Sequence, residues 1–471
     1  MRNDDHFTNR AAANSHGGQG SAAITSADPL AKRTGLVGTN ICVIGGGFVG
    51  LVAAAGFAQF GHNVVCVERN PEYLAMLQQG RVPFYERDLD GLIRTHLQTG
   101  RLSFLGDLAE GVNDTQAIFI AVGTPSDPSG RAELSAIDEV ARGLAASVRP
   151  GQVVVIKSTV PVGTGSRLQA QLNERYGADG AISVVNNPEF LREGSAVWDF
   201  FNPQRIVIGS RSQEAIRVVS DIYRLGMMRT VNIITANNET AELIKYASNA
   251  FLATKIGFIN EMALICDRAG INVLEVARAM GQDSRIGSEF LEPGPGWGGS
   301  CFRKDLQEFT GFARSQGASL AIAEAVLTAN QKQFAAVVTK VISLTGDLAG
   351  RRVAVLGLAF KANTSDMRDS AALPIVRELL ARGATVCAYD PEAHIEATNW
   401  IPDIELAESA YAAAAGADCL LIITEWAEFQ SLDLGRLADT MAQRNIVDAR
   451  NIIAPETAHR YGFQYVGMGQ S

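Results

Sequence analysis

The turn Gly45-Gly46-Gly47-Phe48-Val49-Gly50 constrains the fold of this chain more than any other stretch. The short apolar run before it, Asn40 to Ile44, is typical of a buried strand, and the alanine-rich stretch from Leu51 to Phe60 predicts a helix. A second predicted strand, Asn63 to Val67, ends at Glu68, about 20 residues beyond the turn. This order of a strand, a G-x-G-x-x-G turn, a helix, a strand and an acidic residue indicates a dinucleotide-binding unit in an α/β fold.

The fingerprint glycines and the acidic residue have separate roles in such a unit. Gly45 would make the tight turn, Gly47 would admit the pyrophosphate, and Gly50 would let the helix pack closely. Glu68 would accept hydrogen bonds from the ribose hydroxyls and repel a 2′-phosphate, which favours NAD over NADP, although the neighbouring Arg69 works against this preference. The alternative is a nucleotide-type fold that binds no dinucleotide.

Two further apolar runs indicate strands that continue a doubly wound sheet. Ala117 to Val122 is soon followed by Thr124, and Val153 to Lys157 is soon followed by Thr159. Because ligands bind outside the carboxyl ends of the strands in such sheets, both threonines are candidate ligand contacts. Their hydroxyls could equally cap the next helices. One more strand, Arg205 to Gly209, is expected to close the first domain.

Two pairs of polar residues four positions apart are candidates for chemistry. Glu189 and Glu193 follow a proline, and their spacing suits one face of a helical turn, although solvated charge is an equally good interpretation. The apolar-periodic run from Glu239 to Ala269 predicts one long helix, in which Lys245 and Asn249 share a face. A lysine inside a buried stretch can serve as a cation or an oxyanion donor; the alternative is a lysine on the solvent face.

Cys301 has different neighbours from the other five cysteines, which lie in predicted strands or, for Cys266, in the long helix. It follows the glycine-rich run Gly294 to Gly299 and precedes charged residues, so Ser300 is a candidate cap for a helix that begins there. A thiol in the first turn of a helix lies at the positive end of the dipole. With Lys304 nearby, its pKa should fall below about 8.5. Cys301 is therefore a candidate nucleophile; the alternative is a buried cysteine beside a turn.

The pattern of a strand running into glycine starts again near residue 351, after a second long helix expected from Ala318 to Leu344. Arg352 to Gly357 is the new strand, and Gly383 to Asp390 mirrors the earlier strand that ends at Glu68. The second and third fingerprint glycines are missing, so no dinucleotide is expected here. Lys361 and Arg368 follow the first strand, where a nucleotide phosphate would lie. Further strands are expected at Ala417–Thr424 and Asn445–Asp448.

Composition argues against several classes of protein. The net charge of -9 argues against a nucleic-acid binder. Six cysteines without close pairing and six histidines without ligand spacing predict neither a disulfide framework nor a metal site. No apolar run approaches the roughly 20 residues that span a membrane. The N-terminal stretch has no continuous apolar core, so we expect a flexible tail rather than a secretory signal, and a cytoplasmic location.

Taken together and in order, the motifs resemble those of the UDP-glucose/GDP-mannose dehydrogenase family over about residues 40–455. Besides the first glycine turn, they are Val122–Pro125, Lys157–Thr164, Asn187–Gly194, Glu242–Tyr246 with Asn249, and Gly298–Phe302. The resemblance implies oxidation of the C6 alcohol of UDP-glucose to a carboxylate, with two NAD and one water.

The resemblance implies a fold of class α/β, with two Rossmann-like doubly wound domains joined by a central helical region that contains a long helix. The expected units are a flexible tail (1–37), an NAD-binding domain (38–236), a helical dimerisation domain with the cysteine loop (237–345) and a UDP-sugar-binding domain (346–471).

Roles for the first oxidation and the thiol also follow from the resemblance. Thr159 and Asp305 would hold a water that takes the proton of the C6 hydroxyl, with Lys245 nearby. Cys301 would attack the aldehyde to give a thiohemiacetal, which keeps the aldehyde bound for the second hydride transfer.

Later steps involve three residues. Lys245 and Asn249 would stabilise the developing oxyanion. The second hydride transfer leaves a thioester, and Glu189 would act as general base in its hydrolysis.

Further binding residues are implied in the same way. For the cofactor the resemblance adds Thr124, Thr159, Glu193, Lys304 and Arg368 to the residues of the first glycine turn and Glu68. For the UDP-sugar it implies Glu189, Phe190, Leu191, Arg192, Glu193, Lys245, Asn249, Phe290, Leu291, Glu292, Pro293, Gly294, Gly298 and Lys361. Arg285 would reach the sugar in a partner subunit's site, so a homodimer or higher oligomer is expected, with the long helix as its interface.

Three positions depart from the usual pattern of the family. Arg303 and Arg87 stand where bacterial relatives often carry proline, and Glu68 stands where aspartate is common. Arg303 is expected either to change the start of the helix or to contact the cofactor. None of the three positions removes a catalytic group.

Three alternative functions remain at this point. The nearest is a sister enzyme that oxidises GDP-mannose or a UDP-N-acetylhexosamine. A two-electron hydroxyacid dehydrogenase would need neither Cys301 nor the second α/β domain. A non-catalytic NAD sensor would have no use for Lys245, Asn249, Cys301 and Asp305 together.

Overall fold

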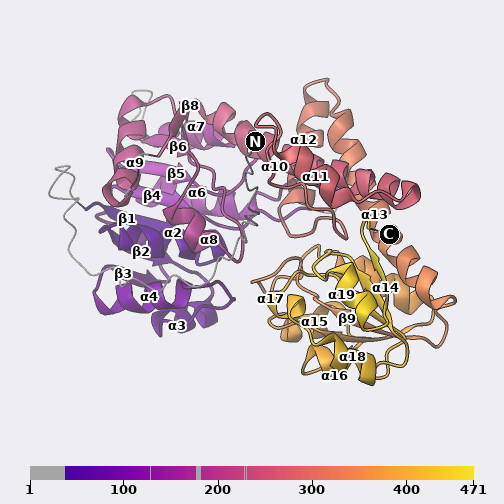
Figure 1. The fold of residues 1–471 in the computed structure, drawn as a ribbon. Helices are drawn as coiled ribbons and strands as arrows, with labels where there is room; N and C mark the ends of the chain where they lie inside the picture. The colour runs from indigo at the N-terminus through magenta and orange to yellow at the C-terminus, as the bar shows by residue number, and fades with distance from the viewer. Residues whose placement is uncertain (1–37, 128, 177–181, 228, 230, 471) are drawn as a thin grey trace, which may run out of the picture.

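The chain folds into two α/β units joined by a group of helices, and the computed structural model describes residues 38–127, 129–176, 182–227, 229 and 231–470 (Figure 1). In Figure 1 the first unit runs from indigo to magenta, and the second unit is orange to yellow. The predicted fold class, with two Rossmann-like domains and a central helical region, is confirmed. The predicted tail at 1–37 lies outside the described residues.

The first sheet is mostly parallel and has eight strands. They are β1 (Asn40–Ile44), β2 (Asn63–Val67), β3 (Leu102–Leu105), β4 (Ala117–Ile120), β5 (Val153–Ile156), β6 (Ser183–Asn186), β7 (Ile206–Gly209) and β8 (Ile233–Ala236). Their order is β3-β2-β1-β4-β5-β6-β7-β8, and the β6–β7 pair is antiparallel. The expectation that β7 closes the first domain is wrong, because β8 pairs with it on the outer side.

Helices cover the first sheet, so its central strands are buried on both faces and read as continuous apolar runs. The helices are α2 (Phe48–Gln59), α3 (Pro71–Gln78), α4 (Leu89–Gln98), α5 (Leu108–Val112), α6 (Ser135–Ser147), α7 (Thr164–Tyr176), α8 (Ala196–Phe201) and α9 (Gln213–Gly226). Helix α2 is buried along most of its length. Its Gly56 packs against the ring of Phe200, where a Cβ would overlap the ring.

Four helices form the central region: α10 (Asn238–Ala269), α11 (Val273–Gly281), α12 (Phe302–Ser315) and α13 (Ala321–Thr345). The two long helices predicted from apolar periodicity are confirmed within three residues at their ends. Helix α10 begins after Asn237, whose side chain accepts a hydrogen bond from the Thr240 N–H, and it ends at Gly270 in the left-handed conformation (φ 66°).

The second sheet is parallel throughout and has the order β11-β10-β9-β12-β13-β14. Its strands are β9 (Arg352–Leu356), β10 (Thr385–Tyr389), β11 (Glu405–Leu406), β12 (Cys419–Ile422), β13 (Asn445–Asp448) and β14 (Gln464–Gly467). Its helices are α14 (Ala372–Ala381), α15 (His394–Trp400), α16 (Ala410–Ala414), α17 (Ala427–Gln430), α18 (Leu434–Thr440) and α19 (Pro455–Arg460). This is the strand order of a doubly wound Rossmann sheet.

The turn after β9 differs from the turn after β1. The backbone N–H groups of Leu358 and Ala359 donate to Asp390 Oδ2 at 2.7 and 3.0 Å. Two backbone donors of this turn, which could face a phosphate, are therefore already bound to a carboxylate.

The end of the chain ties the second unit to the central helices. The Gly469 N–H donates to Asp267 Oδ1 of α10 at 3.0 Å, and the Gly469 carbonyl accepts from the Val273 N–H of α11 at 2.9 Å. Lys340 of α13 pairs with the same Asp267 at 2.7 Å. No helix within the described ranges is long and apolar enough to cross a membrane.

Candidate active site

The loop 294–300, before Cys301, is held between the two long helices. Asn260 of α10 accepts a hydrogen bond from the Gly294 N–H at 2.8 Å. Asn330 of α13 accepts from the Trp297 N–H at 2.8 Å and donates to the Trp297 carbonyl at 2.9 Å. Buried side-chain amides thus bind the backbone of this loop on both sides, which fixes its path.

The same loop also touches the second α/β unit. A Cβ at Gly298 would lie 2.6 Å from the Asp369 carbonyl oxygen, and a Cβ at Gly299 would lie 2.8 Å from the ring of Phe360. Gly299 has a φ of +86°, a conformation that other residues rarely adopt. The glycines therefore allow the cysteine loop to lie directly against the nucleotide-type fold of the second unit.

Cys301 lies at the start of α12. It is the exposed one of the six cysteines, all of which lie in the described residues. The expected cap by Ser300 is wrong: Cys301 itself is the N-cap residue, and the Ser300 Oγ lies 3.8 Å from the Cys301 Sγ.

The expected fall in the pKa of Cys301 is also wrong. Although solvent reaches the residue, protein atoms surround the thiol, and this desolvation raises its pKa to about 11, with a further increase from the Asp305 carboxylate. Lys245 and Lys304 act in the opposite direction without overcoming it. In the absence of ligand the thiol is therefore protonated at neutral pH.

Asp305 explains why the nearby lysine has so little effect. The Lys304 ammonium donates to Asp305 Oδ1 at 2.6 Å, and Asn249 Nδ2 donates to Asp305 Oδ2 at 2.6 Å. Asp305 is 1% exposed, one turn into α12, and its charge largely cancels that of Lys304 beside Cys301. Two predicted residues from α10 and α12 thus form one buried network.

Lys245 forms the second part of this network. Its Nζ lies 2.9 Å from Glu189 Oε1, and both residues are buried, at 4% and 8% exposure. Burial raises the pKa of Glu189, but the attraction of Lys245 outweighs it, so the pKa lies below the usual value. Burial lowers the pKa of Lys245, but the charges of Glu189, Cys301 and Asp305 raise it above the usual value. Both groups are ionised at neutral pH.

The expected helical turn around Glu189 and Glu193 is wrong, because residues 187–192 form no helix. Glu189 points to Lys245, and its other oxygen accepts from the Leu191 N–H at 2.5 Å. Pro188 interrupts backbone hydrogen bonding, and the buried ion pair then directs the path of the chain. The two carboxylates therefore belong to different clusters.

Glu193 lies in a cluster with residues of the second unit. Arg368 reaches it at 3.5 Å and pairs with Asp366 at 2.7 Å. Burial, and then repulsion from Asp366, raise the pKa of Glu193 to about 8. In the same region burial holds the pKa of Lys361 below its usual value, although the charge of Glu193 acts in the opposite direction. The predicted cofactor and substrate residues Glu193, Lys361 and Arg368 therefore lie together where the two units meet.

The remaining residues of the 187–194 segment are held by side chains of the first unit. Arg192 forms a bidentate pair with Asp199 of α8 at 2.7 and 3.0 Å. The ring of Phe190 lies 4.0 Å below the guanidinium of Arg205. A predicted substrate segment is thus built from backbone and from side chains that already have partners.

The geometry of the first glycine turn suits a dinucleotide. Gly45 has a φ of +108°, and a Cβ at Gly50 would overlap the Gly45 carbonyl oxygen. A Cβ at Gly47 would meet no atom within 4 Å, so the N-terminus of α2 is open for a phosphate group. Glu68 accepts from the N–H groups of Gly46 and Asn70 at 2.9 and 2.7 Å, and each carboxylate oxygen keeps a lone pair for a ribose hydroxyl.

Two other cofactor candidates are also placed. The Thr124 hydroxyl donates to the Thr159 carbonyl at 2.8 Å, so it joins the two strand ends rather than capping a helix. Arg69, which worked against a preference for NAD, pairs with Glu139 of α6. That pairing reduces the tendency of Arg69 to bind a 2′-phosphate.

The loop between α11 and α12 carries the other predicted substrate residues, Arg285, Phe290, Leu291, Glu292 and Pro293. Lys255 of α10 donates to the carbonyls of Ile286 and Gly287 at 3.2 and 3.3 Å and fixes this loop. The side chain of Arg285 is 87% exposed and pairs with Asp283. Within one chain it therefore points into solvent.

Two departures from the usual family pattern now have partners. Arg303 Nη1 lies 3.2 Å from Asp369 Oδ1, so this residue links the start of α12 to the second unit. Helix α12 runs from Phe302 without interruption, so Arg303 does not disrupt its start. Arg87 is exposed and lies 3.9 Å from Asp88, which begins α4.

Sequence reasoning missed Arg450, which follows β13. Its Nε lies 2.7 Å from the Ile423 carbonyl and 3.0 Å from Glu425, and a Cβ at Gly294 would lie 3.2 Å from its Nη1. Its position after a strand of a doubly wound sheet was the signal that could have identified it.

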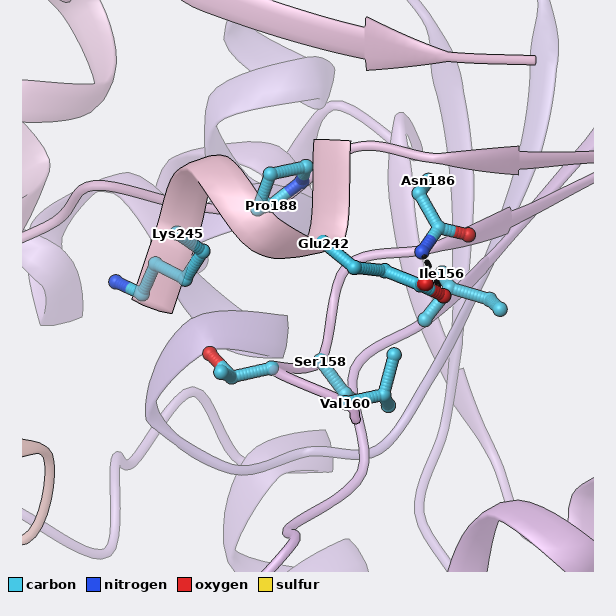
Figure 2. Close-up of a pocket in the computed structure, with 8 residues that line it drawn as sticks. Ile156, Ser158, Val160, Asn186, Pro188, Glu242 and Lys245 are labelled. Atoms are coloured by element: carbon cyan, nitrogen blue, oxygen red, sulfur yellow. Dashed lines mark hydrogen bonds between the residues drawn. The ribbon is translucent and has the colours of Figure 1, made fainter. Parts of the chain in front are cut away.

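Glu242 was also missed as a site residue. It lines a cavity of about 10 Å³, close to the smallest space that holds one water molecule (Figure 2). The lining residues are Ile156, Ser158, Thr159, Val160, Asn186, Pro188, Glu242 and Lys245. Burial raises the pKa of Glu242 to about 7, against the effect of three hydrogen-bond donors.

Three stretches of the chain match three domains of one known family. Residues 39–226 match the NAD binding domain of the UDP-glucose/GDP-mannose dehydrogenase family, 239–332 match its central domain, and 354–455 match its UDP binding domain. A UDP-glucose 6-dehydrogenase of Rhizobium meliloti is 45% identical over 92% of this chain and 99% of its own length. One from Pseudomonas aeruginosa is 41% identical over 92% and 97%.

Two solved structures have a similar fold over most of this chain. The structure of a UDP-glucose dehydrogenase from Pyrobaculum islandicum has a TM-score of 0.86 and 38% identity, covering 93% of this chain and 99% of that one. A UDP-D-ManNAc dehydrogenase from Pyrococcus horikoshii has a TM-score of 0.81 and 26% identity, covering 92% and 99%. The resemblance noted from the motifs is confirmed, and the chain belongs to the UDP-glucose/GDP-mannose dehydrogenase family.

Proposed function

We propose that this protein is a UDP-glucose 6-dehydrogenase that converts the C6 alcohol of UDP-glucose to a carboxylate, with two NAD and one water. The observation that carries the proposal is the position of Cys301. The exposed thiol lies beside the buried network of Lys245, Asn249 and Asp305, and its loop touches both the central helices and the unit that matches a UDP binding domain. A two-electron hydroxyacid dehydrogenase or an NAD sensor would need no such thiol.

NAD, which Gly45, Gly47, Gly50 and Glu68 would hold, would supply the hydride acceptor for each oxidation. The protein must take the proton of the C6 hydroxyl in the first step. Asp305 and Thr159 hold the water that receives it, and the Lys245 ammonium attracts the alkoxide as it develops. Hydrogen bonds from Asn249 and Lys304 hold the Asp305 carboxylate in place, which supports this role.

Cys301 then adds to the C6 aldehyde. A carbon–sulfur bond forms, the thiol loses its proton, and the carbonyl oxygen becomes the hydroxyl of a thiohemiacetal. The high pKa of the thiol means that its proton leaves as the bond forms rather than beforehand. Lys245 and Asn249 donate hydrogen bonds to the developing oxyanion and so lower the barrier to the addition.

Hydrolysis completes the reaction after the second oxidation has produced a thioester on Cys301. Glu189 removes a proton from the attacking water, directly or through a second water. A carbon–oxygen bond forms, the carbon–sulfur bond breaks, and the thiol regains its proton. The low pKa of Glu189 supports this role, because an ionised carboxylate is available at neutral pH.

The choice of sugar is the part of this proposal that needs a direct test. Purified protein and NAD should be mixed with UDP-glucose, GDP-mannose and UDP-N-acetylhexosamines, and NADH formation followed for each. We expect kcat/KM for UDP-glucose to exceed that for the others by about 100-fold, since bulky acetamido groups and a different base are poorly accommodated. Faster turnover of a UDP-N-acetylhexosamine would instead identify a sister enzyme.

We also propose a homodimer that pairs through α10. Its large exposed apolar residues, Leu243, Phe251, Phe258 and Ile265, follow one another at intervals of seven or eight and so share a face of the helix. Phe251 is 66% exposed, which is unusual for a phenylalanine in a helix of this length. In such a dimer the exposed Arg285 would reach the partner's site.

Loss of this apolar face should separate the subunits. Phe251→Glu/Phe258→Glu places two like charges at the proposed contact on each chain, so we expect a monomer by size-exclusion chromatography with light scattering. The control is Ile395→Glu, which changes an exposed residue of α15 in the second unit and should leave the dimer intact. A doubly substituted protein that still elutes as a dimer would contradict the proposed interface.

The location and the domain boundaries remain proposals as well. A cytoplasmic location is supported by six free cysteines, one of them exposed, which suits a reducing compartment. The boundaries at 236 and 345 coincide with the ends of β8 and α13.

A further inference from the structure

Glu242 joins three segments that carry proposed catalytic residues. It lies three residues before Lys245 in α10, so both side chains leave neighbouring positions on one face of the helix. Figure 2 shows its carboxylate beside Asn186, at the end of β6, while Lys245 extends from the same helix. Only 3% of Glu242 is exposed.

All of the partners of this carboxylate are hydrogen-bond donors. Oε2 accepts from the Gly163 N–H at 2.6 Å, and Oε1 accepts from the Gly165 N–H at 2.7 Å and from Asn186 Nδ2 at 2.6 Å. Helix α7 begins at Thr164, so these backbone groups have no acceptor within their own helix. A carboxylate from α10 therefore completes the start of α7 and the end of β6 at one point.

Two glycines make this close approach feasible. Gly163 has a φ of +97°, which few other residues adopt. A Cβ at Gly165 would overlap Asn186 Oδ1 and lie 3.1 Å from the Cβ of Asn238 in α10. The backbone at both positions is therefore shaped for contact with α10 rather than for a generic turn.

Each of the joined segments leads to a reacting group. The loop that ends at Gly163 carries Thr159, and the chain that leaves β6 at Asn186 reaches Glu189 three residues later. Glu189 in turn lies 2.9 Å from Lys245, one turn beyond Glu242. A change at Glu242 would thus move three groups relative to one another, although Glu242 itself contacts none of the reacting atoms.

We propose that Glu242 is a positioning residue that holds Thr159, Glu189 and Lys245 in their reacting arrangement. This inference rests on the proposed function, because it assigns Glu242 to the same reaction. Glutamine at this position would replace one oxygen by an amide NH₂ group. Because every partner is a donor, at least one of Gly163, Gly165 and Asn186 would then face another donor.

The experiment compares Glu242→Gln with Glu239→Gln. Glu239 lies one turn earlier in α10 and binds Ser166 of α7 and Arg211, but it contacts neither Gly163 at the end of the loop that carries Thr159 nor Asn186 at the end of β6. Both substitutions replace a carboxyl group by an amide at the same interface. The labelling stoichiometry reports the fold, because native protein exposes Cys301 whereas misfolded protein also exposes the five buried thiols. Only protein that takes up one label per chain enters the value of kcat.

For Glu242→Gln we expect kcat per labelled thiol to fall about 10- to 100-fold, because small misplacements of reacting groups cost rates of that size. The KM for UDP-glucose should change by less than about threefold, since the nucleotide is bound elsewhere. Glu239→Gln should keep kcat within about twofold of the unchanged protein. A purely structural role would lower the melting temperature of Glu242→Gln but leave kcat per labelled thiol unchanged, which would overturn the proposal.

Asn186→Ala keeps the test decisive if Glu242→Gln does not fold. It removes one donor and leaves the carboxylate with its two backbone partners, so kcat should fall by about threefold to tenfold. An unchanged kcat in this variant would also overturn the proposal. The unchanged protein separates this inference from the function on which it rests. If the unchanged protein forms no NADH from UDP-glucose, the proposed function is refuted. If it forms NADH and both substituted proteins keep its kcat, only the role of Glu242 is refuted.

Discussion

Cys301→Ser should lose net formation of the uronic acid by about 10⁴-fold or more while NAD binding and the fold survive. A serine hydroxyl is a far weaker nucleophile than a thiol, and the substitution otherwise changes one atom at the start of α12. The aldehyde would then no longer be held covalently. Acid formation should be measured by separation of the nucleotide sugars, and NAD binding by titration calorimetry.

A matched cysteine distinguishes lost chemistry from lost stability. Cys387→Ser makes the same change in β10, beside Arg352 and Glu405, which can bind the new hydroxyl. That variant should keep its full activity. Acid formation by Cys301→Ser within tenfold of the unchanged protein would contradict the covalent mechanism.

Lys245→Met should lower kcat by about 10²- to 10³-fold, as expected when an oxyanion donor is removed from a buried site. Methionine has a similar length and no charge, so packing changes little. The substitution also leaves Glu189 buried without its cation, which should lower the free energy of unfolding by about 3 kcal/mol at neutral pH. Turnover and urea unfolding measure the two effects separately.

The pH dependence of this loss has a defined sign. In the unchanged protein the depressed pKa of Glu189 contributes stability that is present above the unfolded pKa and is lost as pH falls through the folded value. Without Lys245, burial dominates and raises the pKa of Glu189, so the variant should lose stability as pH rises above the unfolded pKa of about 4.3.

Two further variants isolate the ion pair. Lys245→Met/Glu189→Gln should recover part of the stability, because no buried charge is left alone, but it should recover no activity. Lys340→Met, in α13, breaks the mostly buried pair with Asp267 of α10 and should leave kcat unchanged. A normal kcat in Lys245→Met would contradict the proposed stabilisation of the oxyanion.

The sequence predicted most interior strands of both sheets but missed the edge strands. The strands β1 and β2 were predicted with the bounds that the structure has, because central strands are apolar on both faces and end in glycine or charge. Four of the missed strands, β3, β8, β11 and β14, lie at sheet edges, where part of each strand is exposed and the apolar run is broken. The fifth, β6, is an interior strand, but its apolar run is only Val184-Val185 between polar residues. Helix α10 was predicted almost to the residue because its periodicity continues for many turns.

The candidate site was predictable as a set of residues but not as a set of partners. Motif order identified Cys301, Lys245 and Asp305, yet the effect of Lys304 on the thiol depends on its contact with Asp305. Desolvation of Cys301 depends on the protein packed around it, part of which is the second unit. The contact of Arg303 with Asp369, 66 positions later in the sequence, is an example of how that unit reaches the start of α12. Such long-range contacts leave no local pattern in the sequence.

The count of NADH formed per UDP-glucose consumed tests the central claim most directly. With UDP-glucose limiting and NAD in excess, the reaction should run to completion and be measured by absorbance and by separation of the sugars. Four-electron oxidation through Cys301 predicts two NADH and one UDP-glucuronate for each UDP-glucose. One NADH per sugar, with an aldehyde as the product, would contradict it.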